Sequence, residues 1–246
     1  MIIAVCNQKG GVAKTATAQA IATGAAQIGR KSLAVDLDPQ GNLSFSMGGN
    51  SADMGTYELL TGQTTPGQII QHTKQGDIIT ASSSLALADT SFTGADRSKL
   101  LAKALQPIKK KYDVIVIDCP PALNILLVNA LIAADVVIIP MTADIYALQG
   151  LYQLKQSIDA AQKTNPGLVI GGVLFTKHST RTILARDLTD VITDKCRELD
   201  IPVYNATIRE SVAVREAQTQ RMSIFEYAPR SNPAKDYMQL IKEMNL

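Results

Sequence analysis

The most constraining feature of this sequence is a glycine-containing turn near its N-terminus, between an apolar run and a helical pattern. The apolar run is Ile2 to Val5, and the helical pattern covers Ala16 to Ile28. A turn that joins a strand to a helix points successive backbone N–H groups at a phosphate chain, and the helix N-terminus adds partial positive charge. Lys14 contributes a full charge, and the Thr15 hydroxyl is a suitable ligand for Mg²⁺. The sequence therefore predicts a phosphate-binding loop.

This loop differs from the generic phosphate-loop pattern G-x-x-x-x-G-K-[ST] at both glycines, because the chain has Gln8 and Ala13 there. A methyl group at residue 13 strains the backbone by about 1–2 kcal/mol if the local φ angle is positive. The loop also has a lysine on each side of its two glycines, Lys9 and Lys14, and one triphosphate needs only one of them. The residues alone leave two interpretations of Lys9, a solvated loop lysine or a functional cation.

Carboxylates follow two of the apolar runs that we interpret as buried strands. Ser32–Val35 leads into Asp36 and Asp38, and Tyr112–Ile117 leads into Asp118. At the carboxyl ends of parallel strands these groups would lie beside the phosphate loop. Residues one apart in an extended chain point to opposite sides, so only one of the first pair is expected to face the phosphates. The residues alone also allow another interpretation, in which these aspartates only belong to turns or strand ends and have no function.

Three motifs, KGGxxKT from Lys9, DxDPQGN from Asp36 and DCPP from Asp118, occur in this order. They resemble the ParA/MinD family of ATPases, whose phosphate loop is called a deviant Walker A motif. The resemblance extends over nearly the whole chain. Where the usual loop reads KGGVGKTT, this chain has Ala13 for glycine and Ala16 for threonine. We therefore expect nucleotide binding to be weaker than is usual in the family.

The resemblance implies an ATPase that uses ATP and Mg²⁺. Lys14 would be the lysine of the site itself, Lys9 would reach across a dimer interface to the partner's nucleotide, and Asp38 would position the attacking water. By their place at a strand end, Thr176 and Lys177 are candidates for contact with adenine. The expected nucleotide-binding residues are Lys9, Gly10, Gly11, Val12, Ala13, Lys14, Thr15, Ala16, Thr176 and Lys177. Thr15 and Asp118 are the expected magnesium ligands.

Strand and helix patterns alternate along the chain, which predicts an α/β fold with a doubly wound, mostly parallel sheet and helices on both faces. Further strands are expected at 77–80, a candidate edge strand, and at 135–140, 168–176 and 203–205. Further helices are expected at 99–108, 124–133, 146–161 and 182–196. We expect residues 1–246 to form a single domain of the P-loop type, without an N-terminal helix-turn-helix extension.

The composition limits the kinds of partner that the protein is expected to bind and the compartment in which it is expected to occur. The net charge is +2, so attraction to nucleic acid needs a local basic patch or its doubling in a dimer. Aromatic residues make up only 4% and tryptophan is absent, which argues against base-stacking platforms. The three scattered cysteines form no C-x-x-C motif, and the N-terminus does not resemble a signal peptide. The longest apolar run, Leu131 to Met141, is too short for a membrane span, so we expect a cytoplasmic protein without a membrane partner.

The C-terminal part contains basic residues interleaved with acidic ones. Two interpretations are open: helix faces with i,i+4 charge pairs, or a basic stripe that binds DNA when two copies meet. The family binds DNA without sequence preference through C-terminal basic residues, but two of its arginine positions are absent from Arg209–Ala217. Tyr227–Ser231 resembles the family's YDPRS. The candidate DNA-binding residues are Arg209, Arg215, Arg221, Arg230 and Lys235.

The resemblance also implies a function. ATP and Mg²⁺ would close two subunits into a homodimer that binds double-stranded DNA non-specifically on the nucleoid. A centromere-binding protein of the ParB type would stimulate slow hydrolysis, which would open the dimer, release DNA and so segregate a plasmid or chromosome region. The alternatives are a MinD-like or cargo-positioning ATPase and a weakly catalytic, nucleotide-dependent interaction protein. Because its charges are mixed and only weakly basic, we expect the last helix, from Ala234 to Leu246, to pack on the sheet.

Overall fold

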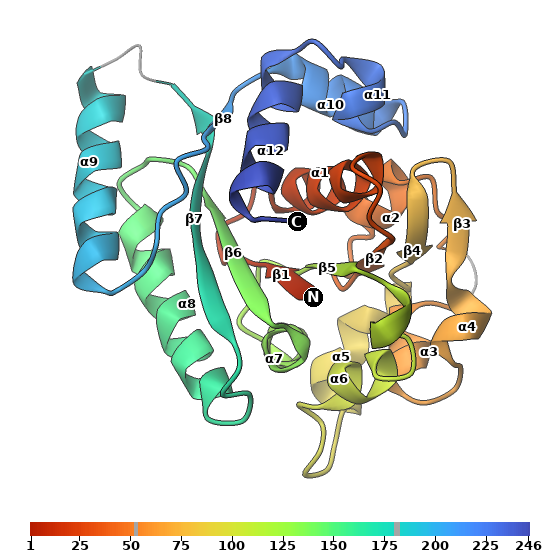
Figure 1. The fold of residues 1–246 in the computed structure, drawn as a ribbon. Helices are drawn as coiled ribbons and strands as arrows, with labels where there is room; N and C mark the ends of the chain where they lie inside the picture. The colour runs from red at the N-terminus through yellow and green to blue at the C-terminus, as the bar shows by residue number, and fades with distance from the viewer. Residues whose placement is uncertain (52–53, 180–182) are drawn as a thin grey trace.

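The computed structural model describes residues 1–51, 54–179 and 183–246. Its strands are β1 (Ile2–Val5), β2 (Ser32–Asp36), β3 (Gln71–Thr73), β4 (Gly76–Ile79), β5 (Val114–Asp118), β6 (Val136–Met141), β7 (Val169–His178) and β8 (Ile208–Arg209). They form a sheet in the order β3-β4-β2-β5-β1-β6-β7-β8, which runs through the centre of the molecule in Figure 1. Neighbouring strands are parallel except in the β3–β4 hairpin. The predicted mostly parallel sheet is confirmed.

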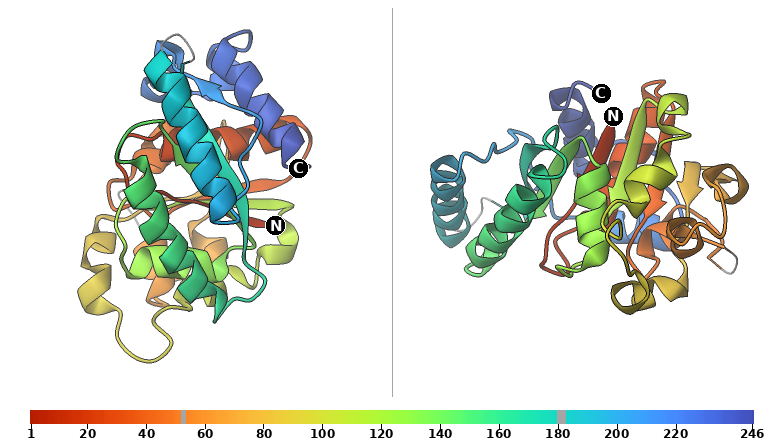
Figure 2. Two further views of the ribbon diagram at one scale, coloured as in Figure 1. Left: turned by 90° about the vertical axis from the view of Figure 1, so that its left-hand side faces the viewer. Right: turned by 90° about the horizontal axis from the view of Figure 1, so that it is seen from below.

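Helices cover both faces of this sheet, as predicted. They are α1 (Lys14–Gln27), α2 (Asn42–Ser46), α3 (Thr56–Leu60), α4 (Pro66–Ile69), α5 (Ala88–Ser91), α6 (Leu100–Leu105), α7 (Ile125–Ala133), α8 (Ala147–Gln162), α9 (Ile183–Glu198), α10 (Val212–Thr219), α11 (Ile224–Tyr227) and α12 (Asn232–Glu243), with 3₁₀ turns η1 (Ser83–Leu87) and η2 (Lys109–Lys111). One apolar core lies under α6 to α9, and another lies under α1, α2, α11 and α12 (Figures 1 and 2). Along β1, Ile2 and Ala4 enter the first core while Ile3 and Val5 enter the second, because successive strand residues point to opposite faces.

The register of the central strands brings the motifs to one edge of the sheet. Val5 pairs with Asp118, and Asp118 pairs with Asp36 on its other side. The loop that follows β1 therefore starts next to two acidic strand ends. Strand β1 lies in the middle of the sheet, with β5 on one side and β6 on the other. Open α/β sheets bind ligands outside the carboxyl ends of such strands.

The sequence interpretation was incomplete at both edges of the sheet. The strand predicted at 77–80 is present as β4, but it is not an edge strand because the unpredicted β3 pairs with it. The strand predicted at 203–205 is wrong, since Val203 forms only an isolated bridge to Val173. The N–H groups of Asn205 and Ala206 donate to the Glu243 carboxylate at 2.8 and 2.9 Å, which draws the chain away from the sheet toward α12. Pairing resumes two residues later at β8.

Most predicted helices are present with ends shifted by a few residues. The helix predicted at 182–196 is described from Ile183 onward, and residue 182 lies outside the described part of the chain. The long stretch between β2 and β5, where the sequence was least informative, holds four short helices (α2 to α5), a hairpin and a 3₁₀ turn before α6 in its described residues. Short elements of this kind have too little periodicity to be recognised from apolar spacing.

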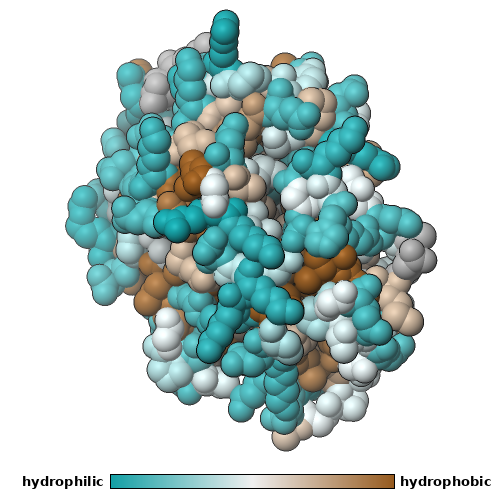
Figure 3. All heavy atoms as spheres, turned by 45° about the vertical axis from the view of Figure 1, so that its right-hand side comes forward, coloured by the Kyte–Doolittle hydropathy of each residue, from teal (hydrophilic) through white to brown (hydrophobic). Residues whose placement is uncertain are grey.

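Helix α12 packs on the body of the protein, as expected. Tyr237, Leu240 and Ile241 are at most 1% exposed. The contact with α1 is so close that a Cβ atom on Gly24 would lie 2.2 Å from Cδ1 of Ile241. Among the described helices, none has both the length and the apolar composition needed to cross a bilayer. In the view of Figure 3, hydrophobic residues form small separate patches on a mostly hydrophilic face.

Candidate nucleotide-binding site

The loop between β1 and α1 is held open by two left-handed backbone positions. Gly11 has φ 76° and Ala13, the residue before α1, has φ 62° and ψ 32°. The side chain of Asn7 fixes the start of the loop, because its Nδ2 donates to Pro140 O at 2.7 Å and its Oδ1 accepts from Lys9 N at 3.0 Å. The φ angle at Ala13 is positive, and this is the case in which a methyl group at residue 13 strains the backbone. The backbone N–H groups of such a loop and of the start of α1 form a site where an anion can bind.

Lys14 lies inside the loop and is 7% exposed. Its ammonium group donates to Lys9 O at 3.0 Å, so the side chain folds back over the turn. Burial lowers the pKa of Lys14, while the charges of Asp118 and Asp38 oppose this shift. The result is a cation fixed between the phosphate loop and the acidic strand ends.

Asp118 is a buried carboxylate without a complete set of partners. It is fully buried, and among the described residues no donor of normal hydrogen-bond geometry reaches either oxygen. Burial raises the pKa of Asp118 well above its usual range, the charge of Asp36 raises it further, and the nearby Thr15 hydroxyl lowers it. In its ionised form such a group needs a cation, directly or through water.

The donor set around Asp118 fits Mg²⁺. It consists of carboxylate and hydroxyl oxygens, which this ion prefers, from Asp118 and Thr15. In the described part of the chain, no cluster of three or more His, Cys, Asp and Glu side chains is arranged to hold a metal alone. An ion here would need phosphate oxygens and water as further ligands, which is the usual way that proteins bind Mg²⁺ with a nucleotide.

Asp36 and Asp38 have different surroundings. The Asp36 carboxylate accepts hydrogen bonds from Ser44 N and Ser44 Oγ, both at 2.7 Å, so it anchors the chain that forms α2. Burial raises the pKa of Asp36 to about 6, although the bonds from Ser44 lower it. Asp38 lines the cavity beside the loop, and its Oδ1 accepts from Gln40 N at 3.0 Å. Of the two aspartates, only Asp38 is placed to meet a bound ligand.

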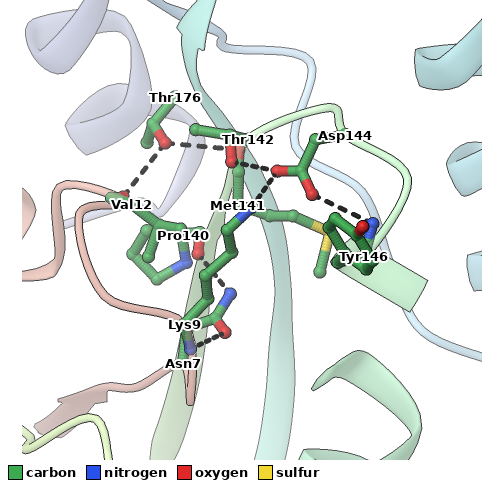
Figure 4. Close-up of polar contacts among 9 residues, drawn as sticks. All are labelled: Asn7, Lys9, Val12, Pro140, Met141, Thr142, Asp144, Tyr146 and Thr176. Carbon is green, nitrogen blue, oxygen red and sulfur yellow. Dashed lines mark hydrogen bonds and ion pairs between the residues drawn. The ribbon is translucent and has the colours of Figure 1, made fainter. Parts of the chain in front are cut away.

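Lys9 is neither in the cavity nor free in solvent. Its ammonium group forms an ion pair of 2.5 Å with Asp144, which follows β6 (Figure 4). The Thr142 hydroxyl donates to the same carboxylate at 2.6 Å, and Tyr146 N donates at 3.1 Å. Burial acts to raise the pKa of Asp144, but these hydrogen bonds, led by that from Lys9, hold it below its usual value. Asp144 was missed at the sequence level, because Thr142 and Ala143 separate it from β6, whereas Asp118 directly follows its apolar run.

The cavity has a volume of about 670 Å³, within the range of small-molecule sites. One side is the phosphate loop with Asp38, and the other side is formed by the segment from β8 into α10 and by α2. Among its lining residues are Gly10, Gly11, Ala13, Lys14, Thr15, Ala16, Asp38, Phe45, Lys177, Glu210, Val214 and Arg215, whereas Lys9 and Val12 are absent from its wall. The wall formed by α10 was not expected from the sequence, because helix spacing does not reveal which distant element closes a cavity.

The two residues proposed for adenine contact differ in placement. Thr176 is 1% exposed, and its hydroxyl lies 3.0 Å from Val12 O and 3.2 Å from Met141 O (Figure 4). The structure therefore corrects the prediction for Thr176, which supports the loop from beneath instead of facing a base. Lys177 lines the cavity and has φ 49°.

The candidate DNA-binding residues are not equivalent. The Arg209 guanidinium donates two hydrogen bonds, of 2.6 and 3.0 Å, to the Asp236 carboxylate. The structure therefore corrects the prediction that Arg209 binds DNA, because this arginine forms a structural ion pair instead. Arg215, Arg221 and Arg230 are exposed, as is Lys235, and none of these four forms an ion pair with a described residue. They belong to α10, α12 and the connections of α11, which lie together at the top of Figure 1.

Comparison with known proteins identifies the family. A family model described as an AAA domain matches residues 1–170. The sporulation initiation inhibitor protein Soj of Bacillus subtilis is 39% identical over 249 residues, which cover 99% of this chain and 97% of Soj. The chain belongs to the ParA/Soj family of ATPases.

Other members of the comparison support this assignment. The chromosome-partitioning ATPase Soj of Treponema pallidum is 35% identical over 242 residues, covering 97% of this chain and 94% of the relative. The solved structure of cobyrinic acid a,c-diamide synthase from Mycobacterium smegmatis, with bound ATP analog and magnesium, superposes with a TM-score of 0.86. It is 33% identical and covers 98% of this chain and 92% of that one. The similarity to these proteins thus extends over nearly the whole chain.

Replacing Ala13 with glycine tests the strain in this ParA/Soj loop. The Ala13→Gly variant should raise the free energy of unfolding by up to about 1 kcal/mol, because relief of the left-handed conformation outweighs the extra entropy of glycine in the unfolded chain. Urea unfolding measures the change. In the control Ala20→Gly, inside α1, the same chemical change should lower stability by about 1 kcal/mol. Equal losses in both variants would contradict the strain at Ala13.

Proposed function

We propose that this protein is an ATP-dependent partition ATPase, in which Mg-ATP closes two subunits into a dimer that binds DNA without sequence preference. Hydrolysis, accelerated by a centromere-binding partner of the ParB type, opens the dimer and releases DNA. The observation that carries this proposal is the separation of the two loop lysines. Lys14 lines the cavity, whereas Lys9 lies outside its wall and is paired with Asp144. A lysine that does not line the cavity of its own subunit is available to contact the nucleotide of a second copy.

The phosphate chain of ATP would lie along the loop from Gly10 to Thr15. The backbone N–H groups and the start of α1 receive the phosphate oxygens, and Lys14 balances their charge. When bound, Mg²⁺ would neutralise charge on the phosphates, held by the Thr15 hydroxyl and, through water, by Asp118. The base would lie toward Lys177 and the start of α10, which form the far wall of the cavity.

Hydrolysis requires a water molecule in line with the bond between the γ-phosphorus and the bridging oxygen. Asp38 lines the cavity near Lys14 and presents a carboxylate that can orient this water. Water adds to the γ-phosphorus, the bridging oxygen leaves with ADP, and phosphate is released. Because phosphoryl transfer depends mainly on positioning and on charge stabilisation, Lys14 and the partner subunit's Lys9 together supply the positive charge that the transition state needs.

The ion pair between Lys9 and Asp144 makes dimer closure reversible. The two side chains are 40% and 29% exposed, and pairs of this kind contribute about 0–1 kcal/mol. A γ-phosphate in the second subunit offers a stronger, more highly charged acceptor than Asp144. Lys9 would therefore exchange Asp144 for the partner's nucleotide when ATP is present and return after hydrolysis.

Two variants test the hydrolytic site. Lys14→Ala should weaken ATP binding by roughly 10- to 100-fold, because it removes a charged hydrogen bond in a buried site. Asp38→Ala should bind ATP like the unmodified protein and lose turnover, since it keeps the phosphate loop but not the group that orients water. Titration with a fluorescent ATP analogue and phosphate-release assays measure the two effects. Asp159→Ala, on the exposed face of α8, is the matched control. Normal ATP affinity in Lys14→Ala, or turnover in Asp38→Ala, would refute these roles.

A second pair of variants tests the exchange of Lys9, using Asp38→Ala as background to prevent hydrolysis. Lys9→Ala should remain monomeric with ATP, because it lacks the crossing cation. Asp144→Ala should dimerise at an ATP concentration up to about fivefold lower, since the competing ion pair is gone. Sedimentation velocity measures the monomer–dimer distribution. Lys155→Ala, which removes another surface ion pair, is the control. ATP-dependent dimers of Lys9→Ala would exclude the proposed switch.

DNA binding is proposed for the exposed cations near α10 to α12. In a dimer this segment occurs twice, which doubles a local positive field although the whole chain has a net charge of only +2. The separate, unpaired arginines suit phosphate contacts, which carry no sequence information. Arg209 is left out of this surface because Asp236 already neutralises it.

The salt dependence of DNA retention tests this surface. Arg230→Ala should lower the slope of log affinity against log salt by about two per dimer, because one phosphate contact per subunit is lost. Filter binding with ATP at several salt concentrations measures the slope. Arg30→Ala removes an exposed arginine just before β2 and should leave the slope unchanged. Arg209→Ala should instead lower the temperature of unfolding, as it leaves buried Asp236 unpaired. An unchanged slope in Arg230→Ala would remove this residue from the DNA surface.

A further inference from the structure

A pair of buried glutamines joins four parts of the chain behind the nucleotide cavity. Gln75, in the turn of the β3–β4 hairpin, has its amide nitrogen 2.6 Å from Ser46 O and 2.8 Å from Arg221 O. The amide nitrogen of Gln19, on α1, lies 2.8 Å from Gln75 Oε1, 3.1 Å from Ser46 O and 3.2 Å from Met222 O. The two side chains are 4% and 8% exposed. This glutamine junction thus holds the end of α2 against the turn between α10 and α11.

The turn held by this junction has an unusual backbone. Arg221 has φ 53°, a left-handed conformation that costs a non-glycine residue free energy. Such conformations persist where the surroundings fix them, and they gather at functional positions. Here the carbonyl groups of Arg221 and Met222 are the ones that the glutamine amides bind. The end of α10 sets this conformation, because Arg221 N donates to Gln218 O at 3.0 Å and Met222 N donates to Ala217 O at 2.9 Å. The junction adds hydrogen bonds to the carbonyl groups of the same two residues.

The same turn contacts the nucleotide cavity through α2. The Arg221 guanidinium lies over the ring of Phe45, 4.5 Å from its centroid. Phe45 and Ser46, the last residues of α2, both line the cavity. Arg221 is consequently bound to α2 twice, by its side chain on Phe45 and by its backbone through Gln75 and Ser46.

Helix α2 in turn follows the catalytic aspartate directly. Gly41 N donates to Asp38 O at 2.9 Å, and Phe45 N donates to Gly41 O at 2.9 Å. A change in the backbone at Asp38 would therefore act directly on the start of α2. Because the glutamine amides are buried and hydrogen-bonded, water does not replace them at the carbonyl groups of α2 and of the turn.

We propose that Gln19 and Gln75 are positioning residues that link occupancy of the nucleotide cavity, through α2, to the position of Arg221 on the DNA surface. The link rests on the proposed function for its biological meaning, but the mechanical coupling itself needs only nucleotide binding. An apolar core would have been satisfied by leucine or methionine at these positions, whereas the amides are needed to bind three backbone carbonyl groups of two separate segments.

Amide hydrogen exchange tests the coupling without DNA. The unmodified protein is compared with Gln75→Met, which matches the length of the side chain but cannot donate to Ser46 O and Arg221 O. With Mg²⁺ and a non-hydrolysable ATP analogue, the unmodified protein should show slower exchange both in the phosphate loop and in the turn at 220–222. Gln75→Met should keep the change in the loop and lose the change in the turn. Gln63→Met, at an exposed glutamine after α3, should behave like the unmodified protein.

A double-mutant cycle in DNA binding tests whether the coupling acts through Arg221. Gln75→Met should lower the slope of log affinity against log salt by about two per dimer, as should Arg221→Ala. The double variant should show no further loss, because both changes remove the same contact. Gln19→Met serves as a second variant of the junction if Gln75→Met folds poorly.

The outcomes are distinct. A turn that fails to respond to nucleotide in the unmodified protein, or that responds fully in Gln75→Met, overturns the coupling. Additive losses in the double variant exclude Arg221 as its route. If the turn responds as expected but the unmodified protein does not retain DNA with ATP, the junction stands and the proposed DNA function fails.

Discussion

The functional end of this molecule depends on a balance between one buried ammonium group and three nearby carboxylates. Lys14 is fixed inside the loop, and Asp36, Asp38 and Asp118 lie at or just beyond the ends of adjacent strands. The site is therefore short of positive charge even before a triphosphate arrives. Additional cations must accompany the nucleotide, and the unpartnered oxygens of Asp118 provide a place for a divalent ion. In the proposed dimer, the partner's Lys9 would supply further positive charge, which gives a physical reason for joining two copies.

The parts of this site that follow from strand-to-loop transitions could be predicted from the sequence. Each transition combines a buried apolar run with a motif of glycines or aspartate after it, as after Val5 and after Ile117. Parallel pairing brings such strand ends together. The fold class came from the same signal. The motif resemblance then distinguished Asp38 from Asp36, which spacing alone could not do.

Features that depend on contacts between distant segments were not predictable in this way. The pairing of Lys9 with Asp144 spans 135 positions, and the contact of Gln75 with Arg221 spans 146. Arg209 had the same appearance in the sequence as Arg215, yet Asp236 neutralises only Arg209. Thr176 was correctly placed at a strand end, but its hydroxyl is directed toward the loop backbone. In each case the decisive information is the identity of the neighbour across the tertiary structure.

The final helix has a consequence for the integrity of the sheet. Strand β8 is only two residues long, and α12 clamps it through Asp236 on Arg209 and through Glu243 on the segment just before it. Beneath it lies the ten-residue strand β7, whose outer edge would otherwise be open to pairing with other chains. Deletions or fusions that displace α12 would therefore expose the edge of β7 to strand exchange, and they would also disturb the nucleotide cavity, because Ile208 and Arg209 of β8 line it.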